Sequence, residues 1–186
     1  MVPGIKLINL LSDKNCFFIY NIRYNYQISC FVLTIYQLIA YNNIVGGESV
    51  NLKIISLEND VRDFLRELKE VLTDTKFDVS KDLDILQKKS SELPTDPYTT
   101  ANTLLALDFD KNDVLNQLLA LDISEYMGTI VDDKDNSWPP FFAFGKTIKN
   151  REVYIKAKIR DRKNCKVFCV SFHFARYPLP TKRPYA

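Results

Sequence analysis

Residues 152–160, near the C-terminus, alternate apolar and polar side chains. This is the pattern of a β-strand with one buried face. The apolar positions predict that face: Val153, Ile155, Ala157 and Ile159. The opposite face carries groups that could do chemistry, a phenol and three cations: Tyr154, Lys156, Lys158 and Arg160. Positive charge in a row beside an aromatic ring suits a polyanion.

A second alternating run, residues 165–174, contains the only histidine of the chain. We expect its larger apolar residues to be buried: Phe168, Val170, Phe172 and Phe174. The other face then presents Cys169, Ser171 and His173. If the two runs pair as a hairpin with their apolar faces on the same side, the histidine joins the lysine row.

These groups are suited to cutting RNA without a metal ion. That reaction needs a base for the 2′-hydroxyl, cations for the pentacoordinate phosphorane and an acid for the departing 5′-oxygen, and it leaves a 2′,3′-cyclic phosphate. Histidine can be base or acid near pH 7, and tyrosine can donate a proton or stack on a base. We expect the catalytic residues to be His173, Tyr154 and Lys156. We expect RNA to be bound by Lys146, Lys158, Arg160, Arg176 and Tyr177, with Trp138 as a further stacking surface.

Positive charge is concentrated at the C-terminal end. Residues 146–186 hold 12 of the 25 lysines and arginines but only 2 of the 23 acidic residues, a balance of +10. The preceding part holds 13 basic and 21 acidic side chains, a balance of −8. This asymmetry favours nucleic acid or an acidic partner at the basic end, because phosphate contacts supply most sequence-independent affinity. The alternative is a solvated edge hairpin whose lysines prevent aggregation.

The sequence offers no motif for a metal or cofactor, and we expect neither. Its four cysteines form no CxxC pair, and Cys165 and Cys169 lie too far apart along one strand for a disulfide, which fits a reduced cytoplasm. The acidic stretch 132–136 lacks the glycine and glutamate of a calcium loop, and no GxGxxG or P-loop is present. Ser171 lies two residues from His173 on one strand, outside any G-x-S-x-G elbow, so we reject serine catalysis.

Residues 1–49 differ in composition from the rest of the chain. Residues 1–45 carry only four charged side chains and are rich in residue types with AT-rich codons. Residues 28–40 are apolar but shorter than the ~20 residues of a membrane span, and a signal peptide also fits poorly. Residues 46–48 can be encoded by a ribosome-binding sequence, and Val50 by a GTG start codon. We therefore interpret 1–49 as a non-native leader or a flexible extension; a membrane anchor or an N-terminal strand pair is the alternative.

From residue 50 to 186 the chain reads as a single domain. Asn59 or Asp60 can cap a helix that ends near Thr73. Its apolar stripe is Val61, Phe64, Leu65, Leu68, Val71 and Leu72. A short helix is expected from Ser80 or Asp82 to Gln87, followed by a proline-containing loop over 90–98.

Two more helices and three strands complete the expected elements. The helices are 99–107 and a segment capped by 110–113, with the stripe Val114, Leu115, Leu118 and Leu119. The strands are 141–148, 152–160 and 165–174. Helices followed by strands predict an α+β domain, in which an antiparallel sheet of three or more strands is covered by helices on one face.

Five stretches, in this order, carry a resemblance to a known family: Leu104–Asp110, Leu121–Tyr126, Phe144–Lys146, Glu152–Lys156 and Val170–His173. Over about residues 98–177 the chain resembles the MqsR toxins of bacterial type II toxin–antitoxin modules, most specifically in "VYIK" and "VSFH". The resemblance implies a RelE-like fold, metal-independent cleavage of mRNA and an antitoxin encoded nearby. It also implies that Tyr154 is the active-site tyrosine and that Lys156 matches a family lysine. His173 departs from the lysine of the best-known branch, and that branch's glutamine falls here among Phe141 and Phe142.

The function expected from the sequence is a cytoplasmic endoribonuclease of the mRNA interferase type, with mRNA as substrate, an antitoxin as partner and no membrane association. Two other classes stay open. A non-catalytic nucleic-acid-binding module would keep the basic face but tolerate loss of His173. A membrane-anchored interaction protein would require residues 16–45 to enter the membrane.

Overall fold

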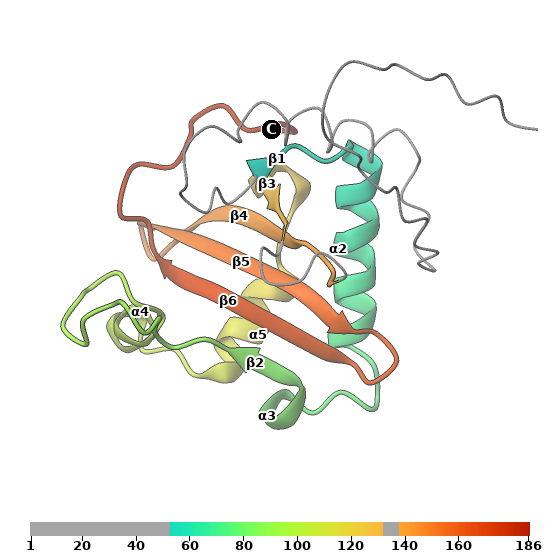
Figure 1. Ribbon diagram of the computed structural model, residues 1–186, viewed down its shortest axis with the longest axis horizontal. Helices are drawn as coiled ribbons and strands as arrows, with labels where there is room; N and C mark the ends of the chain where they lie inside the picture. The colour runs from blue at the N-terminus through green and yellow to red at the C-terminus, as the bar shows by residue number, and fades with distance from the viewer. Residues whose placement is uncertain (1–52, 132–137) are drawn as a thin grey trace, which may run out of the picture.

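The computed structural model describes residues 53–131 and 138–186, in which a central β-sheet is packed against helices (Figure 1). The N-terminal segment 1–49 and the acidic stretch 132–136 lie outside the described residues. The α-helices are α2 (Glu58–Leu72), α3 (Val79–Asp82), α4 (Thr100–Leu107) and α5 (Lys111–Leu119), and a 3₁₀ turn, η1, spans Ile123–Glu125. The α+β class expected from the sequence is confirmed.

The described sheet has six strands in the order β1-β3-β4-β5-β6-β2. The strands are β1 (Lys53–Ile54), β2 (Leu83–Ile85), β3 (Tyr126–Ile130), β4 (Phe141–Ile148), β5 (Arg151–Asp161) and β6 (Lys166–Phe174). Neighbours are antiparallel except β2, which runs parallel to β6. The sheet is therefore mixed, and the expectation of a purely antiparallel sheet is wrong.

The parallel edge strand arises where a helix was expected between residue 80 and Gln87. Only α3 is helical there, capped by Asp78, whose carboxylate accepts a hydrogen bond from the Ser80 N–H. From Leu83 the chain extends because Leu83 fits the core fully buried and β2 pairs with β6. A free sheet edge outweighs the weak helical preference of so short a segment.

Helix α2 buries the six residues of its expected stripe. It begins earlier than expected, with Leu57 rather than Asn59 or Asp60 at the N-cap, and ends before Thr73. Helix α4 forms where the helix 99–107 was expected, with the Thr99 hydroxyl as its cap, and α5 is capped as expected by the Asp110 carboxylate. The amphipathic pattern and the capping residues thus locate the longer helices to within a few residues.

Helix α4 covers the edge of the C-terminal half of β6, beyond the point where β2 ends. The Thr100 hydroxyl accepts a hydrogen bond from the Phe172 N–H at 3.4 Å, and the Thr103 hydroxyl accepts one from the Phe174 N–H at 2.9 Å. Both threonines are buried. Side chains of a helix thereby satisfy the backbone donors that an edge strand would leave open.

The β4–β5–β6 meander forms as the sequence predicts, with one change. Strands β4 and β5 are joined by Lys149 and Asn150, both with positive φ (47° and 61°), the geometry of a tight hairpin turn. Strand β5 buries its four apolar residues as expected. In β6 a bulge at Val170 shifts the alternation, since Lys156 pairs with Ser171 but Ala157 pairs with Cys169.

The bulge changes which β6 side chains enter the main core. Before it, Val167 and Cys169 face the helices; after it, Phe172 and Phe174 do. Phe168 and Val170 instead contact the cluster on the other face of the sheet, so their expected place in the main core, and that of Cys169 outside it, is wrong. Because the shift is complete before residue 171, His173 still lies on the face of the sheet away from the helices, as predicted.

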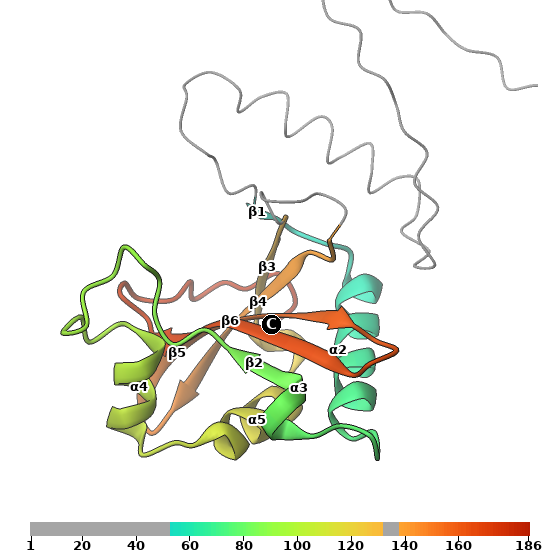
Figure 2. The same ribbon diagram turned by 60° about the horizontal axis from the view of Figure 1, so that its bottom comes forward.

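The two faces of the sheet are covered differently. The larger core lies between the sheet and α2, α4 and α5, while a smaller cluster on the other face is centred on Met127, Phe141, Ala143 and Leu179. Figure 2 shows the helices on one side of the sheet. After β6, Ala175 and Leu179 pack on the side away from the helices, whereas Tyr185 packs against the larger core. Among the described helices, none combines the length and apolarity that crossing a membrane requires.

Candidate active site

Tyr154 and His173 face each other across the β5–β6 hairpin, on the side of the sheet away from the helices. They are register partners, and their ring centroids lie 5.5 Å apart. The next pair on the same face is Lys156 opposite Ser171. The hairpin thus brings together all three expected catalytic residues, His173, Tyr154 and Lys156.

His173 is oriented by its own strand. Its Nδ1 lies 2.9 Å from the carbonyl oxygen of Phe174, which can only accept, so Nδ1 carries the proton and Nε2 keeps its lone pair. Burial lowers the pKa of His173 below the ordinary 6.5, an effect that the Phe174 hydrogen bond partly offsets. The imidazole is therefore neutral at pH 7 and able to accept a proton at Nε2.

Tyr154 is held as a neutral phenol. Burial against the smaller cluster raises its pKa to about 12. Within the described residues the Tyr154 hydroxyl has no hydrogen-bond partner. Every fully buried side-chain oxygen in that part of the chain does have a partner, so the Tyr154 hydroxyl is in contact with solvent. A protonated donor therefore lies beside the neutral imidazole at pH 7.

Lys156 brings positive charge to this face. Its side chain is half-buried, and its ammonium lies 4.6 Å from the centre of the Phe141 ring. Lys156 and Ser171 form the cross-strand pair next to Tyr154–His173 on the same face of the sheet. This places a cation next to the two groups that could exchange protons.

Lys158 is not the surface cation that the alternation predicts. It is fully buried, with its ammonium 4.3 Å from the Phe141 ring and 4.8 Å from the Trp138 ring. Contacts with two aromatic faces compensate part of the cost of burying the charge. An ammonium so enclosed has no surface to offer a phosphate, whereas Trp138, 48% exposed, keeps an open ring.

Arg160 lies at the surface but is engaged within the protein. Its guanidinium donates to the Asp84 carboxylate at 3.0 Å and lies 4.4 Å from the centre of the Phe168 ring. It therefore joins β5 to the β2 edge of the sheet across β6.

Lys146 lies on the opposite face of the sheet from Tyr154. It pairs in register with Val153, which belongs to the helix-covered core. Its ammonium contacts the Glu125 carboxylate at 3.2 Å and donates to the Ala120 carbonyl at 2.8 Å. The structure does not bring this residue to the candidate site.

Arg176 lies close enough to His173 to influence its charge. Its guanidinium is 2.5 Å from the Asp96 carboxylate and 4.7 Å from the centre of the Tyr98 ring. Tyr177, next along the chain, is 76% exposed. The segment after β6 thus offers an oriented cation near His173 and, next to it in the chain, an exposed aromatic ring.

Reasoning from the sequence missed the loop that follows β2. Leu86, Lys88, Lys89 and Glu92 line a small cavity of about 10 Å³ together with Val170, Ser171 and His173. Lys88 is used within the loop, donating to the carbonyls of Lys89 and Glu92, while Lys89 and Glu92 act on the charge of His173. The parallel pairing of β2 with β6 brings this loop here, and no local motif marks that pairing.

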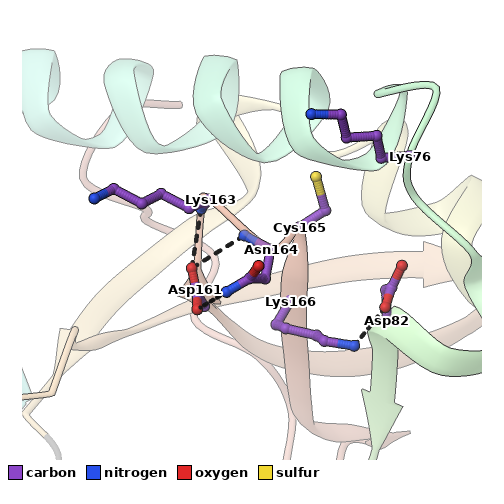
Figure 3. A pocket seen from close by; sticks show the side chains of 7 residues that line it. All are labelled: Lys76, Asp82, Asp161, Lys163, Asn164, Cys165 and Lys166. Atoms are coloured by element: carbon purple, nitrogen blue, oxygen red, sulfur yellow. Dashed lines mark hydrogen bonds and ion pairs between the residues drawn. The ribbon is translucent and has the colours of Figure 1, made fainter.

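A larger cavity, about 490 Å³, lies at the far end of the hairpin (Figure 3). Three lysines and two aspartates line it. Asp82 is 2.5 Å from the Lys166 ammonium, and Asp161 accepts hydrogen bonds from the backbone N–H groups of the turn residues Lys163 and Asn164. Cys165 is buried beside it, and burial raises the pKa of its thiol. We therefore place the candidate site at the other end, where the groups with acid–base chemistry meet.

Comparisons with known proteins identify no relative. The chain matches no model of a known protein family, no curated protein sequence and no solved structure. The described residues also contain no group of three or more histidine, cysteine and acidic side chains that could hold a metal ion. The indication of a function therefore comes from the residues of the site itself.

Proposed function

We propose that this protein is a metal-independent endoribonuclease, acting on mRNA as the toxin of a toxin–antitoxin pair, with a RelE-like arrangement of its α+β fold. The observation that carries the proposal is the Tyr154–His173 pair, a neutral phenol and a neutral imidazole whose ring centroids lie 5.5 Å apart. Lys156 lies in the next cross-strand pair on the same face. The resemblance of "VYIK" and "VSFH" to the MqsR toxins supports the toxin assignment.

The chemistry assigns one role to each residue. His173 Nε2 takes the proton of the 2′-hydroxyl, whose oxygen then attacks the adjacent phosphorus. Lys156 stabilises the negative charge of the phosphorane. The Tyr154 hydroxyl donates its proton or a hydrogen bond to the 5′-oxygen as the P–O bond breaks. The products are a 2′,3′-cyclic phosphate and a free 5′-hydroxyl, so atoms and charge balance without a cofactor.

Neighbouring groups supply binding. The exposed rings of Tyr177 and Trp138 are available for stacking on bases, and Arg176, although paired with Asp96, adds positive charge near His173. The cavity at His173 is too small for a small-molecule ligand, so this surface is better suited to an extended single-stranded nucleic acid. We propose mRNA as the strand and a protein encoded nearby as the antitoxin.

The direct test is cleavage of single-stranded RNA by the purified protein in EDTA. We expect endonucleolytic fragments ending in 2′,3′-cyclic phosphate, identified by mass spectrometry. Cleavage that stops in EDTA would contradict the mechanism, and RNA binding without cleavage would favour a binding module instead. In cells, expression should arrest growth, and co-expression of the neighbouring small protein should relieve the arrest.

A further inference from the structure

The segment after β6 is fastened across the face of the sheet that bears Tyr154. The Ala175 N–H donates to the Glu152 carbonyl at 2.8 Å, and the Leu179 N–H donates to the Glu152 carboxylate at 3.0 Å. The Leu179 side chain is buried directly over Gly145. A β-carbon on Gly145 would lie 2.7 Å from both Leu179 and Met127, so glycine is required for this contact.

A second anchor fixes the end of the segment. The Tyr185 hydroxyl donates to the Ser56 carbonyl, and its ring stacks on Tyr126 with centroids 5.7 Å apart and planes 16° from parallel. Pro180 and Pro184, between the two anchors, restrict the backbone. Residues 180–184 therefore have a defined path over the sheet.

This path places Arg183 on the glycine that pairs with Tyr154. One guanidinium nitrogen of Arg183 lies 3.4 Å from the position that a Gly145 β-carbon would occupy. Gly145 is the β4 register partner of Tyr154, which in turn pairs with His173 on β6. Arg183, Tyr154 and His173 thus follow one line across three strands.

Arg183 differs from the other described arginines in its contacts. Each of those has an ion pair or an aromatic ring as partner: Arg62, Arg66, Arg151, Arg160, Arg162 and Arg176. Arg183 is half-buried, yet within residues 53–131 and 138–186 its guanidinium has no acidic, carbonyl or ring partner. A positioned cation without an internal partner is suited to an external anion.

We propose that Arg183 binds a backbone phosphate of the RNA strand next to the one that is cut. The proposal rests on the proposed function, and it sets the path of the substrate: the RNA crosses the strands from His173 over Tyr154 to Arg183. The anchors at Leu179 and Tyr185 fix Arg183 in advance, so little freedom of the segment is lost on binding.

The test compares Arg183→Ala with Lys163→Ala, a variant that removes the same charge from the exposed turn at the far end of the hairpin. Binding of a short single-stranded RNA is measured over a range of salt concentrations. Losing one phosphate contact should make the slope of log K against log salt less negative by about 0.7. We expect this change in Arg183→Ala, with weaker binding and little change in the rate at saturating RNA, and no change of slope in Lys163→Ala.

An unchanged slope in Arg183→Ala would overturn the inference while leaving cleavage by the parent protein untouched. RNA binding by a parent that does not cleave would refute the catalytic proposal, and the slope would still decide the role of Arg183. Failure of the parent to bind single-stranded RNA would refute both. Because Arg183 makes no internal polar contact, we expect Arg183→Ala to melt at the parent temperature, which circular dichroism checks.

Discussion

At the scale of single residues, the central feature is a pair of neutral groups in complementary states. His173 is unprotonated at Nε2 at pH 7 and can act as a base, because burial lowers its pKa and the Phe174 carbonyl orients Nδ1. Tyr154 keeps its proton and can act as a donor, because burial raises its pKa to about 12. The charged groups that act on His173 are of both signs, Lys89 and Arg176 against Glu92, so burial decides the direction of its shift.

The pair predicts a one-sided pH profile. The base must be unprotonated, and its pKa lies below 6.5, so kcat/KM for RNA cleavage should be level around neutral pH and fall as the pH drops below that pKa. Tyr154 should add no loss until the pH approaches 12. The profile is measured with circular dichroism at each pH to confirm folding. A fall in rate already between pH 8 and 7 would contradict the assignment of His173 as base.

At the scale of elements, the hairpin provides the pairing and α4 fixes the strand that carries His173. The Thr100 and Thr103 hydroxyls accept hydrogen bonds from the N–H groups on either side of His173, those of Phe172 and Phe174. This contact holds β6 where β2 no longer supports it. The rigidity of the site therefore depends on a helix that contributes no chemistry.

Thr103→Val tests this support. Valine has nearly the shape of threonine, so the change leaves the buried Phe174 N–H without an acceptor, which should cost about 1–3 kcal/mol of unfolding free energy. Urea denaturation measures the loss. The control is Thr147→Val, at an exposed position of β4, which should change stability little. Equal effects of the two substitutions would show that the Thr103 hydroxyl does not support β6.

The elements also show which patterns can be interpreted without a structure. The stripe of α2, the range of α4, the cap of α5, and the β4 and β5 strands follow from local periodicity and turn chemistry. The β2 strand and the Val170 bulge do not, because both depend on which strand lies beside β6. The pairing of Tyr154 with His173 was predictable because two alternating runs joined by a short turn have few possible registers.

At the scale of the whole molecule, about half of the C-terminal cations are neutralised by ion pairs or buried within the fold. Five of the twelve cations in residues 146–186 form ion pairs with carboxylates of the preceding part: Lys146, Arg160, Arg162, Lys166 and Arg176. Lys158 is buried as well. The basic half folds onto the acidic half, so a count of charges overstates the positive surface, and Arg183 gains importance as a cation that stays available.

The second half of the site was not predictable from the sequence because long-range packing assembles it. The loop with Lys89 and Glu92 and the segment with Arg183 reach the hairpin from opposite edges of the sheet, through β2 and through the Tyr185 anchor. Neither approach has a local signal, since each depends on a packing partner distant in sequence. The residues on the hairpin itself were accessible to pattern analysis.

The most direct measurement is single-turnover cleavage of a short single-stranded RNA by the parent and by His173→Ala, with RNA binding measured on the same samples. We predict that His173→Ala slows cleavage roughly a hundredfold to ten-thousandfold, leaves binding largely unchanged and is partly rescued by added imidazole, because only the acid–base group is removed. Cleavage by His173→Ala at the parent rate would contradict this role and leave His173 a structural member of the hairpin.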